Sequence, residues 1–131
     1  SRGLGDVYKR QIVICYDIRF CELVRSLALR GIDMLFMVSQ WPLVRTSHIV
    51  TLTKARAIEN QMFVVCCNSC GKTPDAVFGG HSQIIDPWGE VLEAAGEKQE
   101  VITADCDFGT IKDIRNSINV FNDRKPDLYE L

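Results

Sequence analysis

Short apolar runs alternate with stretches of helical periodicity in the first half of this chain, and no other feature restricts its fold as strongly. The runs with the composition of buried strands are Gln11–Asp17, Asp33–Ser39 and Met62–Cys67. The second run is continuously apolar, which is typical of a strand covered on both faces. Strand-helix-strand order favours parallel pairing through right-handed crossovers.

Helical patterns separate these runs. In Cys21–Arg30 apolar side chains recur at helical spacing, and Gly31 suits the left-handed position that follows a helix. A second helix is expected to end near Gln61, and either Thr46 or Ser47 can cap its start. The two helices supply the crossovers that parallel strands need.

The remainder of the chain predicts short strands joined by turns. The expected elements are a loop over Asn68–Gly80, strands at His81–Asp86, Val91–Ala95 and Glu100–Cys106, a helix at Phe108–Ile114 and a polar tail over Asn116–Leu131. The string Asp86-Pro-Trp-Gly89 has proline second and glycine fourth, as in a type I turn. Together the elements predict an α/β domain of the layered α+β kind.

Length and composition exclude several classes of protein. With 131 residues, 47% of them hydrophobic and 24% charged, the chain is one globular domain or less. A net charge of -2 offers no basic surface for nucleic acid, and no apolar run approaches the roughly 20 residues that span a membrane. The amino-terminal residues lack the pattern of a secretion signal, and the six cysteines fall largely in apolar runs or on a predicted helix. We therefore expect reduced thiols and a cytoplasmic protein.

Cys15 lies where the first apolar run gives way to polar residues, shortly before the first predicted helix. A nucleophile at the end of a strand is held on a rigid element and points out of the sheet. The free backbone N–H groups of such a turn can also face an oxyanion. The position therefore predicts a catalytic thiolate. The alternative is that Cys15 is a small buried hydrophobe, as most free cysteines are.

The residues from Cys15 onwards, Cys-Tyr-Asp-Ile-Arg-Phe-Cys-Glu-Leu, resemble the nucleophile motif of the carbon–nitrogen hydrolase (nitrilase-like) superfamily. The motif departs at Cys21, where the family usually has proline. Two further strings, Thr53–Gln61 and Gly79–Leu92, resemble the family's Arg-Ala-x-Glu-Asn helix and its Gly-x-Ser-x-Ile-x-Asp-Pro-x-Gly segment, in the family's order. The resemblance implies a four-layer α-β-β-α sandwich, of which this chain is expected to be the C-terminal half.

The resemblance also implies a reaction. The family hydrolyses linear C–N bonds with a Glu–Lys–Cys triad, through a cysteine thioester and without a metal or other cofactor. It assigns the nucleophile to Cys15 and an oxyanion contact to the backbone N–H of Tyr16. The family's glutamate and lysine precede the cysteine strand, where this chain has only Asp6 and Lys9, and neither matches those motifs. We therefore expect the chain by itself to be weak or inactive as a catalyst.

Residues 1–11 do not resemble the family's sequence before the cysteine strand. We expect them to be a foreign leader or junction, and residues 12–131 to be a partial domain without its N-terminal half. Such a chain would expose sheet surface that the absent half covers, which favours self-association. For the complete protein, the resemblance implies a homodimer formed through the outer helices.

Trp41 and Arg45 follow the second apolar run, whose end is expected beside the end of the first. Arg45 could hold a substrate carboxylate, because a planar guanidinium binds that group bidentately, and Trp41 could form an apolar wall. This arrangement resembles the branch that releases ammonia from small ω-amides of carboxylic or 2-oxo acids. The alternative is an exposed loop arginine beside a packing tryptophan.

Six other residues of these motifs are expected to support the site structurally: Asp17, Arg19, Glu22, Arg56, Glu59 and Asn60. Arg56 and Glu59 are i,i+3 neighbours on one helix face and can pair. The resemblance favours a buried role in bracing the active-site loop over an exposed ion pair, which would contribute little.

Other interpretations stay open at this point. The protein could belong to another branch, such as the carbamoyl-amide hydrolases or the nitrilases, or it could be a non-catalytic module that associates with another subunit. His48 could act as a base for Cys15, although nothing in the sequence places it there. Cys67-Asn-Ser-Cys70 has the spacing of redox and metal motifs, but it lies at a strand exit and lacks a second ligand pair of matching spacing.

Overall fold

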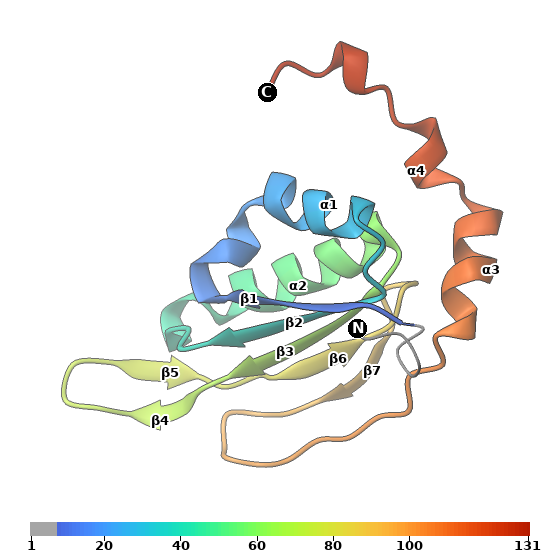
Figure 1. The fold of residues 1–131 in the computed structure, drawn as a ribbon. Helices are drawn as coiled ribbons and strands as arrows, with labels where there is room; N and C mark the ends of the chain where they lie inside the picture. The colour runs from blue at the N-terminus through green and yellow to red at the C-terminus, as the bar shows by residue number, and fades with distance from the viewer. Residues whose placement is uncertain (1–7) are drawn as a thin grey trace.

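The computed structural model describes residues 8–131 and is built on one five-stranded sheet with the order β1-β2-β3-β6-β7 (Figure 1). Its strands are β1 (Arg10–Ile14), β2 (Met34–Ser39), β3 (Phe63–Asn68), β6 (Gln83–Ile85) and β7 (Val91–Ala94). β1, β2 and β3 run parallel, whereas β6 and β7 continue the sheet in the antiparallel sense. The predicted α/β order with parallel pairing in the first half is confirmed.

Helices α1 (Cys21–Leu29) and α2 (Thr46–Asn60) make the crossovers and cover one face of the sheet (Figure 1). Gly31 takes the left-handed backbone expected after α1, with φ of +89°. The predicted cap of α2 is wrong, because no side chain caps this helix. The Thr46 hydroxyl instead donates to the carbonyl oxygen of Leu43 at 2.8 Å and closes the turn before the helix.

The first strand is shorter than predicted, because it ends at Ile14 and not at Asp17. The Asp17 carboxylate accepts a hydrogen bond from the backbone N–H of Ile14 at 3.0 Å. This contact turns the chain, and Cys15–Arg19 form a short 3-10 helix. Cys15 thereby leaves the strand ladder and begins the turn.

The second half of the chain corrects two predictions. The loop predicted over 68–80 contains a hairpin of β4 (Cys70–Lys72) and β5 (Val77–Gly79). The strand predicted over 100–106 is not formed, since the chain there pairs with no strand of the described residues and Val101 is 91% exposed. Alternation in a sequence indicates a possible strand, but a strand also needs a partner edge that the local sequence does not reveal.

The turn and the last long helix are as expected. The backbone N–H of Gly89 donates to the carbonyl oxygen of Asp86 at 3.0 Å, which closes the predicted turn. Helix α3 (Gly109–Ser117) follows, and it extends beyond the predicted Ile114. The segment predicted as a polar tail contains α4 (Val120–Asp123) and a 3-10 turn, and it projects from the sheet domain (Figure 1).

The main hydrophobic core lies between the sheet and the helices α1 and α2. Its buried side chains include Val13, Val24, Leu35, Met37, Ile49, Ala57, Val64 and Ile85. Burying one of the Val, Leu, Ile or Met side chains of this core stabilises the fold by about 1.5–3 kcal/mol. The core therefore fixes the positions of β1 and β2, whose ends carry the candidate nucleophile and its surroundings.

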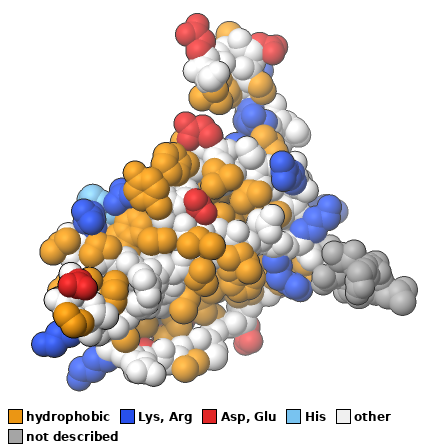
Figure 2. Space-filling view, turned by 60° about the vertical axis from the view of Figure 1, so that its left-hand side comes forward, with side chains coloured by type: hydrophobic (Ala, Val, Ile, Leu, Met, Phe, Trp, Pro, Cys, Tyr) orange, Lys and Arg blue, Asp and Glu red, His pale blue; other side chains and the backbone are white. Residues whose placement is uncertain are grey.

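The opposite face of the sheet is apolar and partly uncovered. Ile12 and Ile14 are each 63% exposed and Val38 is 45% exposed, because they alternate with the buried side chains of β1 and β2. On part of this face, Met34 and Phe63 of the sheet pack against Ile111 of α3 and are buried. The space-filling view also shows hydrophobic side chains gathered across the middle of the molecule (Figure 2). Monomeric proteins rarely expose large continuous apolar surfaces of this kind.

The predicted leader lies largely outside the described residues, which begin at Tyr8. Within the described part, the backbone N–H of Lys9 donates to the Asp33 carboxylate at 2.9 Å, and β1 begins at Arg10. Whether residues 1–11 are native or foreign stays a prediction. Among the described residues, no helix is long and apolar enough to cross a membrane.

Candidate active site

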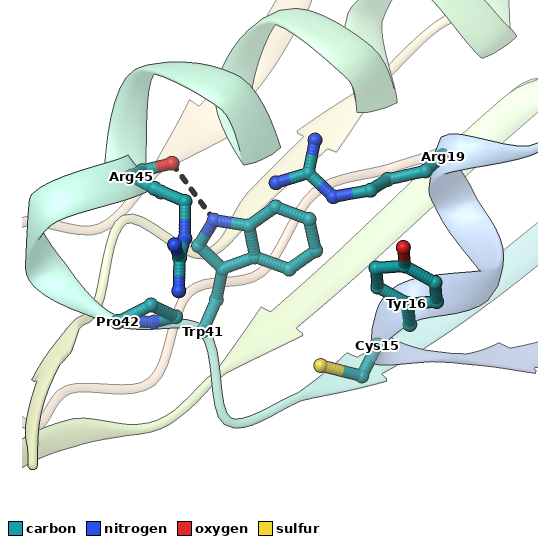
Figure 3. A pocket seen from close by; sticks show the side chains of 6 residues that line it. All are labelled: Cys15, Tyr16, Arg19, Trp41, Pro42 and Arg45. Carbon is teal, nitrogen blue, oxygen red and sulfur yellow. Dashed lines mark hydrogen bonds between the residues drawn. The ribbon is translucent and has the colours of Figure 1, made fainter.

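The carboxyl ends of β1 and β2 meet at one edge of the sheet, and a cavity of about 480 Å³ opens beside them (Figure 3). Its lining residues are Cys15, Tyr16, Arg19, Trp41, Pro42 and Arg45. Parallel strands end on the same side, so residues that follow β1 and β2 come together although they are distant in the chain. The predicted nucleophile and both predicted substrate-binding residues thus face one space.

Cys15 occupies a strained position at the start of the 3-10 helix. Its φ of +45° is left-handed, and this region costs a non-glycine residue about 1–2 kcal/mol. Such a conformation persists only where the surrounding structure enforces it, and it is frequent at functional sites. The Cys15 side chain is half-buried.

Ser39 contacts the sulfur of Cys15, although it is not among the site residues predicted from the sequence. The Ser39 hydroxyl donates to Sγ of Cys15 at 3.6 Å. The available signal was its place as the last residue of β2, the neighbour of β1. The backbone of Ser39 is also fixed, because its carbonyl oxygen accepts the Ser69 N–H at 3.0 Å.

Trp41 forms a buried wall of the cavity and is 3% exposed. Its indole Nε1–H donates to the carbonyl oxygen of Arg45 at 2.7 Å (Figure 3). Its backbone N–H donates to Oδ1 of Asn68 at 2.7 Å, and Nδ2 of Asn68 donates to the carbonyl oxygens of Trp41 and Gly80 at 3.3 and 2.9 Å. Asn68 was not predicted as a site residue, and it holds the loop after β2 against the end of β3.

Arg19 lies between the cavity and His48. Its guanidinium carbon is 4.7 Å from the centre of the Trp41 ring, within the range of a cation–π contact. Its Nη2 is 3.3 Å from Nδ1 of His48. His48 therefore contacts Arg19 and lines a neighbouring cavity, so the structure does not bring His48 to Cys15 as the base considered above.

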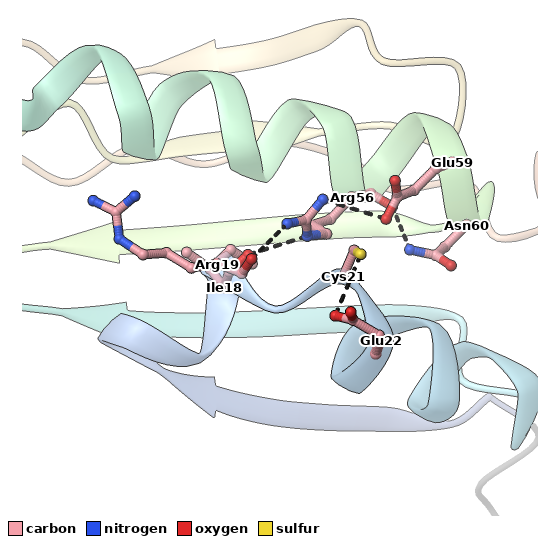
Figure 4. A network of polar contacts seen from close by, with 7 residues as sticks. All are labelled: Ile18, Arg19, Cys21, Glu22, Arg56, Glu59 and Asn60. Carbon is pink, nitrogen blue, oxygen red and sulfur yellow. Dashed lines mark hydrogen bonds and ion pairs between the residues drawn. The ribbon is translucent and has the colours of Figure 1, made fainter. Parts of the chain in front are cut away.

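Arg56 reaches from α2 to the turn that carries Cys15 (Figure 4). Its Nε donates to the carbonyl oxygen of Ile18 at 3.1 Å, and its Nη2 donates to that of Arg19 at 3.3 Å. Its Nη1 pairs with Glu59 at 3.4 Å, so the predicted i,i+3 pair is present. Arg56 is 6% exposed, and this guanidinium joins α2 to two backbone carbonyls of the turn.

The family follows from a direct comparison with known proteins. The chain matches the carbon-nitrogen hydrolase family over residues 3–116. It belongs to this family. Among similar proteins, the 2-oxoglutaramate amidase of Bacillus subtilis strain 168 is 47% identical over 124 residues, covering 95% of this chain and 48% of the relative. This carbon-nitrogen hydrolase chain spans about half the length of the curated relatives it matches.

Solved structures of the family have the same fold over the shared part. The NitFhit protein of C. elegans superposes with a TM-score of 0.88 at 36% identity, covering 92% of this chain and 30% of that protein. A mutant amidase from Nesterenkonia sp. AN1 superposes with a TM-score of 0.77 at 28% identity, covering 89% of this chain and 41% of that protein. That amidase carries the acetamide moiety of fluoroacetamide covalently added at its active-site cysteine.

Two of the residues expected to support the site, Glu22 and Asn60, do not contact the turn that carries Cys15 through the hydrogen bonds that Arg56 makes. The exposed Glu22 carboxylate accepts a hydrogen bond from the Cys21 thiol at 3.4 Å (Figure 4). Its own backbone N–H, and then this thiol, lower the pKa of Glu22. Asn60 is buried, and its Nδ2 donates to the backbone oxygen of Arg56 at 3.0 Å. Neither Glu22 nor Asn60 lines the cavity that contains Cys15. Their supporting role in activity stays a prediction.

None of the other cysteines of the described residues lines the cavity that contains Cys15. Cys66 points into the core, and burial raises the pKa of its thiol to about 12, so it stays protonated at neutral pH. Cys67 is exposed and Cys70 is half-buried at the start of β4. Within residues 8–131, no group of three His, Cys, Asp or Glu side chains is placed to hold a metal ion.

Proposed function

We propose that the protein is an amidase that releases ammonia from a small ω-amide of a carboxylic or 2-oxo acid, with Cys15 as its nucleophile. The observation that carries the proposal is the single cavity lined by Cys15, Trp41 and two arginines. A strained residue at a strand end, facing a cavity, is the arrangement expected of a nucleophile. The similar amidase with an adduct at its active-site cysteine supports the same assignment.

In the proposed reaction, the thiolate of Cys15 attacks the amide carbonyl carbon and forms a carbon–sulfur bond. The carbonyl electrons move to oxygen, and the backbone N–H of Tyr16, near the start of a helix where such groups lack helical partners, donates to this oxyanion. The oxyanion electrons then re-form the carbonyl, the C–N bond breaks, and nitrogen takes the proton that the base had removed from the thiol and leaves as ammonia. Water attacks the thioester carbonyl and gives one proton to the base; the carbonyl re-forms, the C–S bond breaks to release the thiolate, and the carboxylic acid loses its remaining proton to solvent to give the carboxylate.

The general base is not supplied by the described cavity. Among residues 8–131, no carboxylate and no lysine lines the cavity that contains Cys15. The proton transfers of the reaction need a general base, and the family resemblance assigns a glutamate to this task and a lysine to the oxyanion. We therefore propose that turnover by residues 1–131 alone is slow, and that the proposed chemistry belongs to the complete protein.

The proposed substrate carries a carboxylate because of Arg45 and Arg19. Both guanidiniums lie on a cavity that, within the described chain, has no acidic lining residue. A guanidinium binds a carboxylate through two parallel hydrogen bonds. The similar 2-oxoglutaramate amidase is named for an amide of this class.

Replacing Arg45 with alanine should raise KM about tenfold for an ω-amide that bears a carboxylate, because a charge-assisted hydrogen bond is lost. A neutral amide of the same length should change by less than about twofold. The measurement is ammonia release by the full-length protein, and Arg30→Ala is the matched control, because Arg30 is an exposed arginine just after the end of α1 and does not line the cavity. Equal effects on both substrates would remove the carboxylate from the proposal and favour another branch of the family.

We also propose that this chain is the C-terminal half of a four-layer fold. The apolar sheet face that carries Ile12, Ile14 and Val38 supports this, because a second sheet in such a fold would cover it. The order of the three family-like strings supports it as well.

The complete protein is proposed to form a homodimer through its outer helices. Leu23 on α1 and Ile58 on α2 support this, since they are 39% and 49% exposed. Light scattering on the full-length protein should give the mass of two chains, and Leu23→Lys should shift the protein toward one chain. Lys72→Ala, an exposed change on β4 away from both helices, should leave the mass unchanged. A one-chain mass for the unmodified protein at all concentrations would contradict the dimer.

A further inference from the structure

Ser39 occupies a position with a chemical consequence for the nucleophile. It is the last residue of β2, its carbonyl oxygen accepts the Ser69 N–H at 3.0 Å, and its hydroxyl donates to Sγ of Cys15 at 3.6 Å. Both side chains are partly buried, so water competes only weakly for this contact. The hydroxyl is thus held beside the sulfur by the sheet itself.

We propose that Ser39 is a positioning residue that stabilises the thiolate form of Cys15 and aims it into the cavity. A thiol sulfur is a weak acceptor, whereas a thiolate is a strong one, so a fixed O–H donor favours the charged form. No bond is made or broken by Ser39, and its proton stays on the serine oxygen. This inference deepens the proposed function, because it concerns the nucleophile of the same site.

Other charged or titratable groups also lie near Cys15. Arg19 and Arg45 line the same cavity as Cys15. The Tyr16 side chain also lines the cavity. Asp17 lies two residues after Cys15, and its carboxylate accepts the Ile14 N–H at 3.0 Å. These groups are unchanged in a Ser39 variant, so a difference between variants reports the hydroxyl.

The test compares Ser39→Thr, which keeps a hydroxyl, with Ser39→Val, which has nearly the same shape without one. The measurement is the rate of iodoacetamide alkylation at Cys15 as a function of pH, resolved from the other cysteines by peptide mass spectrometry. In Ser39→Val, loss of a hydrogen bond to a charged group should move the midpoint of this profile up by about one pH unit. Ser39→Thr should keep the original midpoint.

The shape of the profile separates this role from a structural one. A thiolate that is harder to form is also intrinsically more nucleophilic, so Ser39→Val should react about threefold faster than the unmodified protein at high pH. At pH 7 it should react about threefold slower, since the loss of thiolate outweighs the gain. A merely structural defect would lower the rate at every pH. Ser26→Ala, a serine change on α1 away from the cavity, should leave the profile unchanged.

The alkylation assay needs no substrate, so its result is independent of the amidase proposal. A shifted midpoint in a protein that hydrolyses no amide would support the role of Ser39 and contradict the proposed function. An unchanged midpoint in Ser39→Val would overturn the role of Ser39, whatever the protein hydrolyses. If Ser39→Val does not fold, Ser39→Ala and Ser39→Gly take its place, and the same midpoints decide.

Discussion

Cys15→Ala in the full-length protein should lower the turnover of ω-amides by at least about ten-thousandfold, because removing a covalent nucleophile leaves only binding and oxyanion contacts. The sulfur lies on the cavity, and no other cysteine lines the part of the cavity that the structure describes. No other cysteine of residues 8–131 is therefore placed to replace it. Ammonia release measures the loss.

The loss should come from chemistry and not from unfolding. Alanine keeps the strained backbone and removes only the sulfur, so Cys15→Ala should unfold within a few degrees of the unmodified protein. Cys67→Ala is the matched control, since Cys67 is an exposed cysteine that does not line this cavity. Retention of more than about one hundredth of the activity in Cys15→Ala would contradict the assignment.

Arg56→Met should destabilise the fold by about 2–4 kcal/mol, because one buried and one part-buried carbonyl oxygen lose their donors. These are the oxygens of Ile18 and Arg19, which accept from Arg56 at 3.1 and 3.3 Å. The methionine fills much of the volume but donates nothing. For a chain of this size, thermal unfolding should begin about 10 °C lower.

The same variant should slow alkylation of Cys15, because the turn that holds the thiol depends on the two carbonyl contacts. Lys54→Met on the same helix is the control, as Lys54 is exposed and its replacement should cost less than about 0.5 kcal/mol. An Arg56→Met protein as stable as the Lys54→Met protein would show that this guanidinium does not brace the turn.

The sequence predicted the features that depend on local pattern and on order along the chain. Cys15, Trp41 and Arg45 were expected together because parallel strands end at one edge, and the cavity contains all three. The continuous apolar run at Asp33–Ser39 predicted a central strand, and β2 lies between β1 and β3. The Arg56–Glu59 pair followed from helical spacing alone.

What the sequence did not reveal depends on contacts between distant residues. Ser39 and Asn68 are ordinary polar residues at strand ends, and their partners Cys15 and Trp41 are identified only by the register of the sheet. The strand expected over 100–106 is not formed, because these residues find no strand to pair with among the described residues. That absence also depends on distant parts of the chain.

Mass spectrometry of the full-length protein during turnover tests the central claim most directly. If Cys15 is the nucleophile, a sample quenched in acid with an ω-amide substrate should carry the acyl group, without its nitrogen, on the peptide that contains Cys15. Cys15→Ala should carry none. Ammonia release with the acyl group on another peptide, or with unmodified Cys15 under conditions that preserve thioesters, would contradict the account.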